Sequence, residues 1–389
     1  MKVTLDRKAM IIISAGIIVF TIAGAMLGRV VAVESPYGYL KLFNEAFYLV
    51  VNNYVQPVQI DTVMEGAYRG MLEAIDPTNE YLKPEEYDRA SRGESAGPAE
   101  VGLALSKKRG YVVVLAVGAR SPAAEAGFRS GDLLISIDGR STRTMGTWEA
   151  TQALRGKPGS RTTIVRNSTE GGHKSVTLVR KVLGLSPPSG ALVGADAGVV
   201  RIGAIHEGDA RRVDQAIASL KAKGAQRLLL DLRGCVSDSL AESIGIASLF
   251  VSDGTIVRVG DRYDGDKAYK SDGRKIAWDR PLVVMVDEGT ARTCEVVAAA
   301  LRDDLGTPIV GQRTWGLGSL QKLIPLRNGD GVLLAVGKLM SPSGKEWNGK
   351  GIDPDLSIEG NENDTGDPQR QKAIDYLRGV SLQGHRTAA

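Results

Sequence analysis

The sequence predicts a protein of several domains, with an α/β core and a β-rich part of the α+β type. Between residues 198 and 305, apolar strands alternate with helical segments, which is typical of a parallel sheet with crossover helices. Between residues 100 and 182, short β-rich runs follow one another around one helical segment, 148–154. The length of 389 residues accommodates two or three such domains.

The N-terminus predicts a membrane segment. Lys2, Arg7 and Lys8 precede an apolar run at 9–27, and a helix of that length spans about 28 Å. We therefore expect a transmembrane anchor at 9–28 and a cytoplasmic tip at 1–8. A cleaved signal peptide is the alternative, because residues 23–25, Ala-Gly-Ala, form a small-residue motif. Both readings export the rest of the chain, and the anchor makes it a single-pass protein of the inner membrane with a periplasmic body.

Composition divides the exported chain into four parts. Residues 35–93 have apolar residues at helical spacing, broken at Pro57 and resumed at Asp61 as an expected N-cap, and predict a helical module. Residues 94–183 hold the β-rich domain, which follows the linker-like GESAGP. Residues 184–379 form the α/β core after a Pro-Pro linker, and the polar tail 380–389 is expected to be disordered.

The stretch from Pro281 to Ala300, PLVVMVDEGTARTCEVVAAA, is the part of the core that indicates chemistry. It predicts a buried strand, a polar turn with Gly289 and a helix that begins near Thr293. A turn that leads from a strand into a helix commonly presents a nucleophile, because the helix amides and dipole stabilise negative charge there. Cys294 stands at this position.

The core resembles the carboxy-terminal processing peptidases, which are tail-specific serine-lysine proteases with a PDZ domain. In that family a glutamate follows the catalytic serine; here Glu295 matches, but the serine is replaced by Cys294. The family's lysine loop appears as GQRTWGLGSLQ at 311–321, with Leu317 in place of the lysine, and the oxyanion loop D-L-R-G-N-P-G-G appears as DLRGCVSD at 231–238. The resemblance implies catalytic positions at Cys294, Leu317 and Gln321, and oxyanion-loop positions at Gly234, Cys235, Ser237 and Asp238.

All three parts of this chemistry are altered. Leu317 cannot accept the proton that a nucleophile loses, although Cys294 needs less help than serine because a thiol is partly ionised at neutral pH. A missing oxyanion donor typically costs about 3–4 kcal/mol of barrier, and Asp238 would bring a carboxylate toward developing negative charge. Gln321 without its lysine is expected to form a structural hydrogen bond. The changes predict poor proteolysis.

The resemblance also brings the two cysteines of the chain side by side. Three states of Cys235 and Cys294 stay open: a disulfide, two separate buried thiols, or a reactive Cys294. A disulfide requires Cα atoms within about 7 Å and would close the former active site. Two cysteines and three histidines offer little material for a metal site, so no metal and no cofactor are predicted.

The β-rich domain resembles PDZ domains. The resemblance rests on SPAAEAG at 121–127 followed by SGDLLISIDG at 130–139. Such domains bind a partner's C-terminus as an added strand, with loop amides holding the carboxylate. By position this loop is Glu100-Val101-Gly102-Leu103, where glycine permits close backbone approach. A PDZ fold that only packs against its neighbours is the alternative.

These observations predict a pseudoprotease that binds protein C-termini or partner proteins. An active paralogue or a second copy of the chain is a further partner that fits this role. The enzymatic alternative is a peptidase that cleaves extracytoplasmic proteins near their C-termini with Cys294 as nucleophile. The net charge of +4 is small for 389 residues, and no nucleic-acid partner is expected.

Overall fold

The computed structural model describes residues 15–21, 36–108, 110–168, 172–184, 186–263, 265–360 and 366–379. Two compact units divide the chain, Met1–Tyr68 and Arg69–Ala389. The predicted tip 1–8 and tail 380–389 lie outside the described residues. Of the predicted membrane segment 9–28, the structure describes residues 15–21, which are helical. Within the described part of the chain, no helix has the length and apolar content required to cross a membrane.

The first unit contains α2 (Pro36–Asn53) and the start of α3 (Ile60–Ile75), which crosses into the second unit. Pro57 lies in the break between the helices, as predicted, because its missing N–H cannot continue a helix. The expected N-cap is wrong. Asp61 lies inside the first turn of α3, where its carboxylate faces the positive end of the helix dipole.

The β-rich domain forms one sheet in the order β2-β3-β4-β6-β7, with β5 beside β4. Strand β2 is at the edge, so one side of its backbone is not paired within the sheet. The expected helix at 148–154 is α6, which packs its buried Leu154 into the domain core. The elements are β2 (Leu103–Lys108), β3 (Tyr111–Val117), α5 (Pro122–Glu125), β4 (Leu133–Ile137), β5 (Arg140–Ser141), η1 (Thr142–Thr144), α6 (Thr147–Leu154), β6 (Arg161–Asn167) and β7 (His173–Val179).

A second sheet forms the centre of the core, in the order β19-β16-β14-β10-β9-β8. All neighbours pair in parallel except β8 with β9, as expected for crossover connections. The strands are β8 (Ser189–Val193), β9 (Ala197–Arg201), β10 (Arg227–Asp231), β14 (Leu282–Val286), β16 (Ile309–Gly311) and β19 (Leu356–Ser357).

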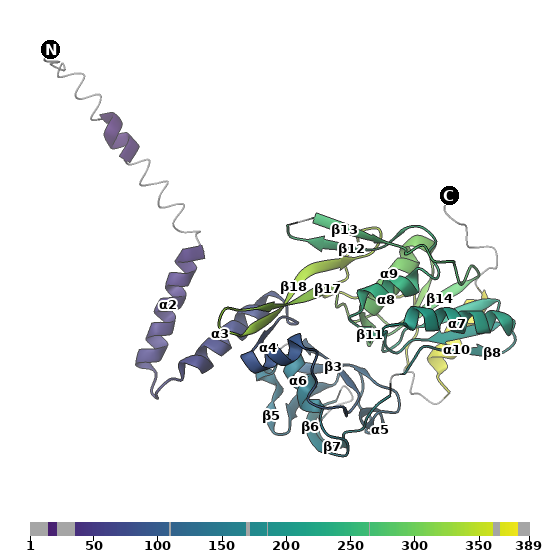
Figure 1. Ribbon diagram of the computed structural model, residues 1–389, viewed down its shortest axis with the longest axis horizontal. Coiled ribbons are helices and arrows are strands. Elements are labelled where there is room, and N and C mark those ends of the chain that lie inside the picture. The colour runs from purple at the N-terminus through teal and green to yellow at the C-terminus, as the bar shows by residue number, and fades with distance from the viewer. Residues whose placement is uncertain are drawn as a thin grey trace, which may run out of the picture. The chain divides into compact units, whose positions relative to one another are not determined.

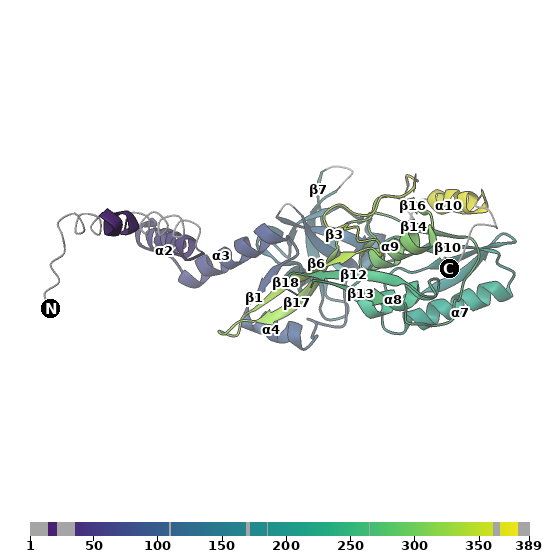
Figure 2. The same ribbon diagram turned by 90° about the horizontal axis from the view of Figure 1, so that it is seen from above.

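Helices cover both faces of this sheet, which explains why its central strands β10 and β14 are mostly apolar and buried. Leu228 and Leu230 belong to the same buried cluster as residues of α7 (Asp209–Ala222), α8 (Leu240–Ala247) and α9 (Thr293–Leu305). Leu229 points to the other face, where α10 (Pro368–Gly379) packs. Figure 2 shows α10 on the opposite side of the sheet from α7 and α8.

The alternation of strands and helices did not predict a third sheet. Strand β12 (Thr255–Asp261), expected in the α/β alternation, pairs instead with β13 (Gly265–Lys270) and β18 (Gly331–Met340), antiparallel in both cases. Strand β17 (Ser319–Pro325) joins β18 in a long ribbon (Figure 1). On its other edge β18 pairs with β1 (Glu80–Leu82), which lies just before α4 (Pro84–Ser91). Residues 80–82, which were predicted to belong to a helical module, therefore form a strand that completes a sheet of the core.

A buried ionic network fastens α10 to the end of β10. Arg233 is 1% exposed and donates to both oxygens of Asp231 at 2.9 and 2.8 Å. The same guanidinium donates to Asp367 at 2.9 and 2.7 Å and to Gln369 at 3.0 Å. Gln369 in turn donates to the carbonyl of Ile358 at 2.9 Å. All the N–H groups of the Arg233 guanidinium thus donate to acceptors inside the fold, away from water.

Replacement of Arg233 tests this network. Arg233→Met leaves the Asp231 and Asp367 carboxylates without their shared partner, and we expect it to lower the free energy of unfolding by about 3–5 kcal/mol. Arg370→Met is the control, because Arg370 approaches Asp367 at 3.5 Å from a partly exposed position and should cost less than about 1 kcal/mol. Urea unfolding at pH 7 measures both; equal losses would contradict the assignment.

Candidate active site

The turn after β14 is held by one carboxylate. Asp287 accepts hydrogen bonds from the backbone amides of Gly234 at 2.7 Å and Gly289 at 3.0 Å, which joins the turn to the oxyanion-loop region. Arg292 follows with φ +60° and ψ −128°, a backbone conformation that residues other than glycine rarely adopt. The strained residue reverses the chain into α9 and sets Cys294 within the first turn of that helix.

The oxyanion-loop region pairs with this turn as a short parallel ladder. Strand β11 (Val236–Ser237) lies beside β15 (Ala291–Arg292), and the amide of Ala291 donates to the carbonyl of Cys235 at 2.9 Å. Ser237 turns its hydroxyl inward to donate to Ile205 O at 2.9 Å. The ladder brings the predicted oxyanion and nucleophile positions together, and the Ser237 hydroxyl is already used inside the fold.

Asp238 lies at the surface of this region. Its side chain is 79% exposed and accepts from Arg292 at 2.6 Å. Gly234 adopts φ +60°, which glycine tolerates and which lets the chain turn between β10 and β11. The Asp238 charge is therefore offset by Arg292 and largely screened by solvent.

Cys235 and Cys294 form a disulfide in this structure. Their Cα atoms are 5.9 Å apart and both side chains are fully buried. Of the three states that the sequence left open, the structure has the first. The chain has only these two cysteines, so the bond leaves no thiol at the predicted nucleophile position.

Leu317 occupies the predicted lysine position as part of an apolar cluster. It is 9% exposed and packs with Ala291 and with Leu115 of β3. Trp315 packs against the same cluster, and its ring lies 5.1 Å from the ammonium of Lys108. Apolar side chains of the β-rich domain and of the core thus fill the position that would hold a general base.

The other candidate polar groups have structural partners. Gln321 donates to the carbonyl of Thr78 at 2.6 Å, which agrees with the predicted structural hydrogen bond. Lys322 on β17 is exposed, and Lys338 on β18 pairs with Glu346 at 3.3 Å at the surface. Both lysines thus lie on exposed parts of the β17–β18 ribbon.

Glu295 is the residue whose importance sequence reasoning missed. Its buried carboxylate accepts from Thr314 Oγ1 at 2.5 Å and from the amides of Gly316 and Leu317 at 2.9 Å each, besides Arg292 N at 3.0 Å. Burial raises the pKa of Glu295 to about 7, although these hydrogen bonds lower it. A single charged residue inside the apolar run CEVVAAAL was the signal that a buried, multiply bonded carboxylate stood there.

The predicted carboxylate-binding loop leads into the edge strand β2. Gly102 has φ +81°, and its carbonyl accepts from Gly118 N at 2.8 Å. Glu100 exchanges backbone hydrogen bonds with Lys181, and its side chain pairs with Arg155 at 3.0 Å. The loop is thereby fixed at the start of a strand whose free edge could accept another strand.

Comparison with known proteins identifies the scaffold. Residues 196–358 match Peptidase family S41, and residues 113–165 match the PDZ domain. A carboxyl-terminal-processing protease of Synechocystis sp. is 31% identical over 341 residues, which cover 83% of this chain and 79% of that protein. The chain belongs to peptidase family S41.

Two further proteins are similar to most of this chain. The carboxy-terminal processing protease CtpA of Bacillus subtilis is 28% identical over 317 residues, which cover 81% of this chain and 68% of CtpA. The structure of a photosystem II D1 C-terminal processing protease is similar with a TM-score of 0.69 and 27% identity, covering 82% of this chain and 92% of the other. The predicted relationship to the carboxy-terminal processing peptidases is confirmed.

The disulfide predicts a specific labelling pattern. Native protein should resist iodoacetamide at pH 7, and its intact mass should be about 2 Da below that of the reduced chain, because each bond removes two hydrogens. Both cysteines should label after reduction under denaturing conditions. Cys235→Ser is the control, since it frees a Cys294 thiol that stays buried and should label slowly. Rapid labelling of native Cys294 without reductant would contradict the bond.

Glu295 predicts a pH dependence of stability. Its folded-state pKa of about 7 exceeds the ordinary 4.5, so between these values the folded protein keeps a proton that the unfolded chain has lost. The free energy of unfolding should therefore fall by on the order of 3 kcal/mol as the pH rises from 4.5 to 7. Glu295→Gln should remove this component, whereas the exposed Glu207→Gln should retain it. Urea unfolding at several pH values in this range measures the free energy of unfolding. If it changed equally with pH in the wild type and both variants, the assignment would be refuted.

Proposed function

We propose that the chain is an exported, membrane-anchored pseudoprotease that binds protein C-termini through its PDZ domain. The observation that carries the proposal is the disulfide between Cys235 and Cys294, which joins the predicted oxyanion and nucleophile positions. A disulfide sulfur carries no proton that a base could remove. It therefore cannot form the thiolate that would attack a peptide carbonyl. The site is chemically closed while the surrounding S41 scaffold is kept.

The lysine position supports the same conclusion. Even if the disulfide were reduced, Leu317 could not accept a proton from Cys294, and its surroundings are apolar side chains. The alternative of an active peptidase with Cys294 as nucleophile would need both reduction and a base from elsewhere. Lys322 and Lys338 lie on exposed strands, so they do not favour that alternative.

Peptide binding is supported by the edge strand β2 and by the backbone of its loop. An extended C-terminal segment gains main-chain hydrogen bonds when it adds to an unpaired edge. Gly102 has no Cβ, which leaves room for Ser121 beside the loop. A ligand can bind at such a loop without any catalytic residue, so loss of chemistry and retention of binding are compatible.

The location follows from the N-terminal sequence and from the cysteines. The basic and apolar segments at 2–27 support a single-pass anchor in the inner membrane, with the body in the periplasm. A disulfide persists in such an oxidising compartment. An active S41 paralogue or a second copy of this chain would be a suitable partner, because a pseudoprotease can act only through what it binds.

Gly102→Ala tests the binding role. An added Cβ would lie 2.2 Å from the Cβ of Ser121, so the loop must move and affinity should fall at least tenfold. Gly127→Ala is the matched control, because Gly127 also has positive φ, at +73°, but its Cβ would meet no atom within 4 Å. The probe is a library of random octapeptides with free C-terminal carboxylates, and binding is read by fluorescence polarisation.

An amidated version of the same library separates carboxylate recognition from nonspecific adhesion. We expect it to bind at least tenfold more weakly, because the loop amides lose a charged acceptor. Mass spectrometry of the incubated peptides should find them intact. Equal binding of both libraries would overturn the PDZ role, and cleavage that persists under oxidising conditions would overturn the pseudoprotease role.

A further inference from the structure

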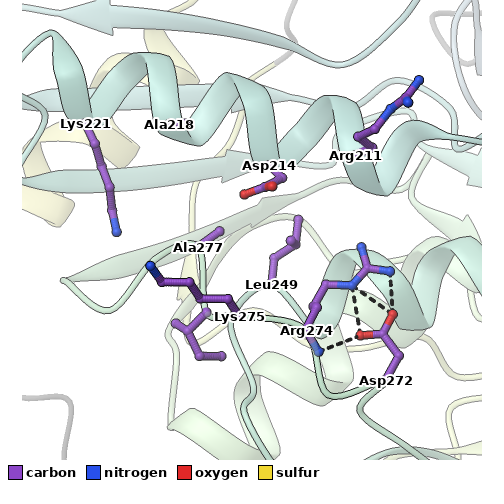
Figure 3. A pocket seen from close by; sticks show the side chains of 10 residues that line it. Arg211, Asp214, Ala218, Lys221, Leu249, Asp272, Arg274, Lys275 and Ala277 are labelled. Carbon is purple, nitrogen blue, oxygen red and sulfur yellow. Dashed lines mark hydrogen bonds and ion pairs between the residues drawn. The ribbon is translucent and has the colours of Figure 1, made fainter.

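A groove of about 550 Å³ lies on the core, away from the residues of the disulfide and of the PDZ loop. One wall is α7 and the other is the segment that follows β13, residues 272–277 (Figure 3). Leu249 lines it between the walls. Neither the degenerate catalytic positions nor the PDZ fold accounts for a charged groove at this place.

The α7 wall presents one face of a helix to the groove. Arg211, Asp214, Ala218 and Lys221 line it, and their spacing of three, four and three residues repeats with the helical period. The rise from the first to the last is about 15 Å. An extended peptide of four or five residues covers the same length.

The opposite wall is fixed by hydrogen bonds at both ends. The amide of Asp272 donates to Ser248 Oγ at 3.2 Å, and the amide of Ala277 donates to the carbonyl of Leu249 at 2.8 Å. Between them, Arg274 donates through Nε to both oxygens of Asp272 at 2.8 Å. A ligand would therefore meet a wall that is already formed, which lowers the entropy cost of binding.

The charges of the groove are unbalanced. Four basic and two acidic side chains line it, and Asp272 is already neutralised by Arg274. Within the described residues, the side chains of Arg211 and Lys275 form no hydrogen bond or ion pair. Figure 3 shows the ammonium groups of Lys221 and Lys275 directed toward the same end of the groove. Lys221 has an acidic neighbour, Asp279, at 3.4 Å, but that carboxylate is 72% exposed.

Asp214 restricts the kind of anion that fits. Its carboxylate points into the groove between the basic groups (Figure 3). A nucleic-acid strand, charged at every phosphate, would meet repulsion there. A peptide can offer a backbone N–H to Asp214 and place acidic side chains beside Lys221 and Lys275.

We infer that this groove binds an extended acidic peptide segment of a partner protein. The segment lies along α7, with one or two carboxylates at the Lys221–Lys275 end and its backbone over Leu249. The groove thus offers this S41 relative a second binding surface, which works independently of the PDZ loop. It would hold a partner by an internal or flexible acidic stretch rather than by its C-terminus.

The test uses the purified full chain and a fluorescein-labelled, C-terminally amidated hexapeptide, Glu-Glu-Ala-Ala-Glu-Glu. Amidation prevents recognition by a carboxylate loop. We expect saturable binding that weakens as salt is raised, at least tenfold weaker binding of the Gln-Gln-Ala-Ala-Gln-Gln analogue, and at least fivefold weaker binding by the Lys221→Gln/Lys275→Gln variant.

Lys223→Gln/Lys270→Gln is the matched control. It removes the same charge from exposed residues that do not line the groove, and it should bind like the wild type. Thermal unfolding of both variants checks that they are folded. No saturable binding below 1 mM peptide, equal weakening in both variants, or equally tight binding of oligothymidylate of six nucleotides would overturn the inference. The Gly102→Ala variant should bind this peptide normally, so failure here is distinct from failure of the PDZ role.

Discussion

The hydrogen bonds of the Glu295 carboxylate are the interaction on which the arrangement of the candidate active site depends. Two of its four donors are the amides of Gly316 and Leu317, and another is the amide that precedes α9. Thr314 donates to the same carboxylate and accepts from the amide of Ile352 at 2.7 Å. One side chain therefore sets the distance between the start of α9 and the loop that carries residue 317. Because three of these four bonds are made to backbone amides, they survive changes in the neighbouring side chains.

These bonds explain how the S41 scaffold is kept around Cys294 and Leu317, which stand at the predicted serine and lysine positions. A lysine beside a nucleophile must be neutral, and burial among apolar groups is what lowers its pKa. The same surroundings suit leucine better, since burying its side chain contributes about 2 kcal/mol and leaves no charge to desolvate. The disulfide closes a loop between residues 59 apart in sequence, which by chain entropy contributes about 4 kcal/mol. In this chain the disulfide of Cys294 and the packing of Leu317 both stabilise the fold.

The features proposed for binding lie apart from the candidate catalytic residues. The edge of β2 and the Gly102 turn are backbone features, and the α7 groove is a pattern of surface charges. None of them requires the nucleophile, the base or the oxyanion loop. The two proposed binding modes, main-chain pairing at β2 and charge complementarity along α7, therefore do not depend on catalysis.

Local features of the chain could be read from its amino-acid sequence. Apolar runs such as RLLLDL and PLVVMV specified the buried parallel strands, and the turn before Thr293 specified where α9 begins. The motifs around Ser121 and Asp231 specified the family, because they depend on short-range spacing. Cys294 and Leu317 could also be recognised as replacements from the sequence, because each differs from a family motif whose other residues mostly match.

Tertiary structure alone decided the features that join distant segments. The alternation of strands and helices could not reveal that β12 pairs with β18, nor that β1 does so from the other side, because pairing depends on partners that neither strand encodes locally. The sequence left three states for the two cysteines, and the β11–β15 ladder brought their Cα atoms within bonding reach. The role of Glu295 and the contact of Leu317 with Leu115 were hidden for the same reason. Burial and hydrogen bonding are properties of three-dimensional neighbours: Leu317 is 22 residues from Glu295 and 202 residues from Leu115 in sequence.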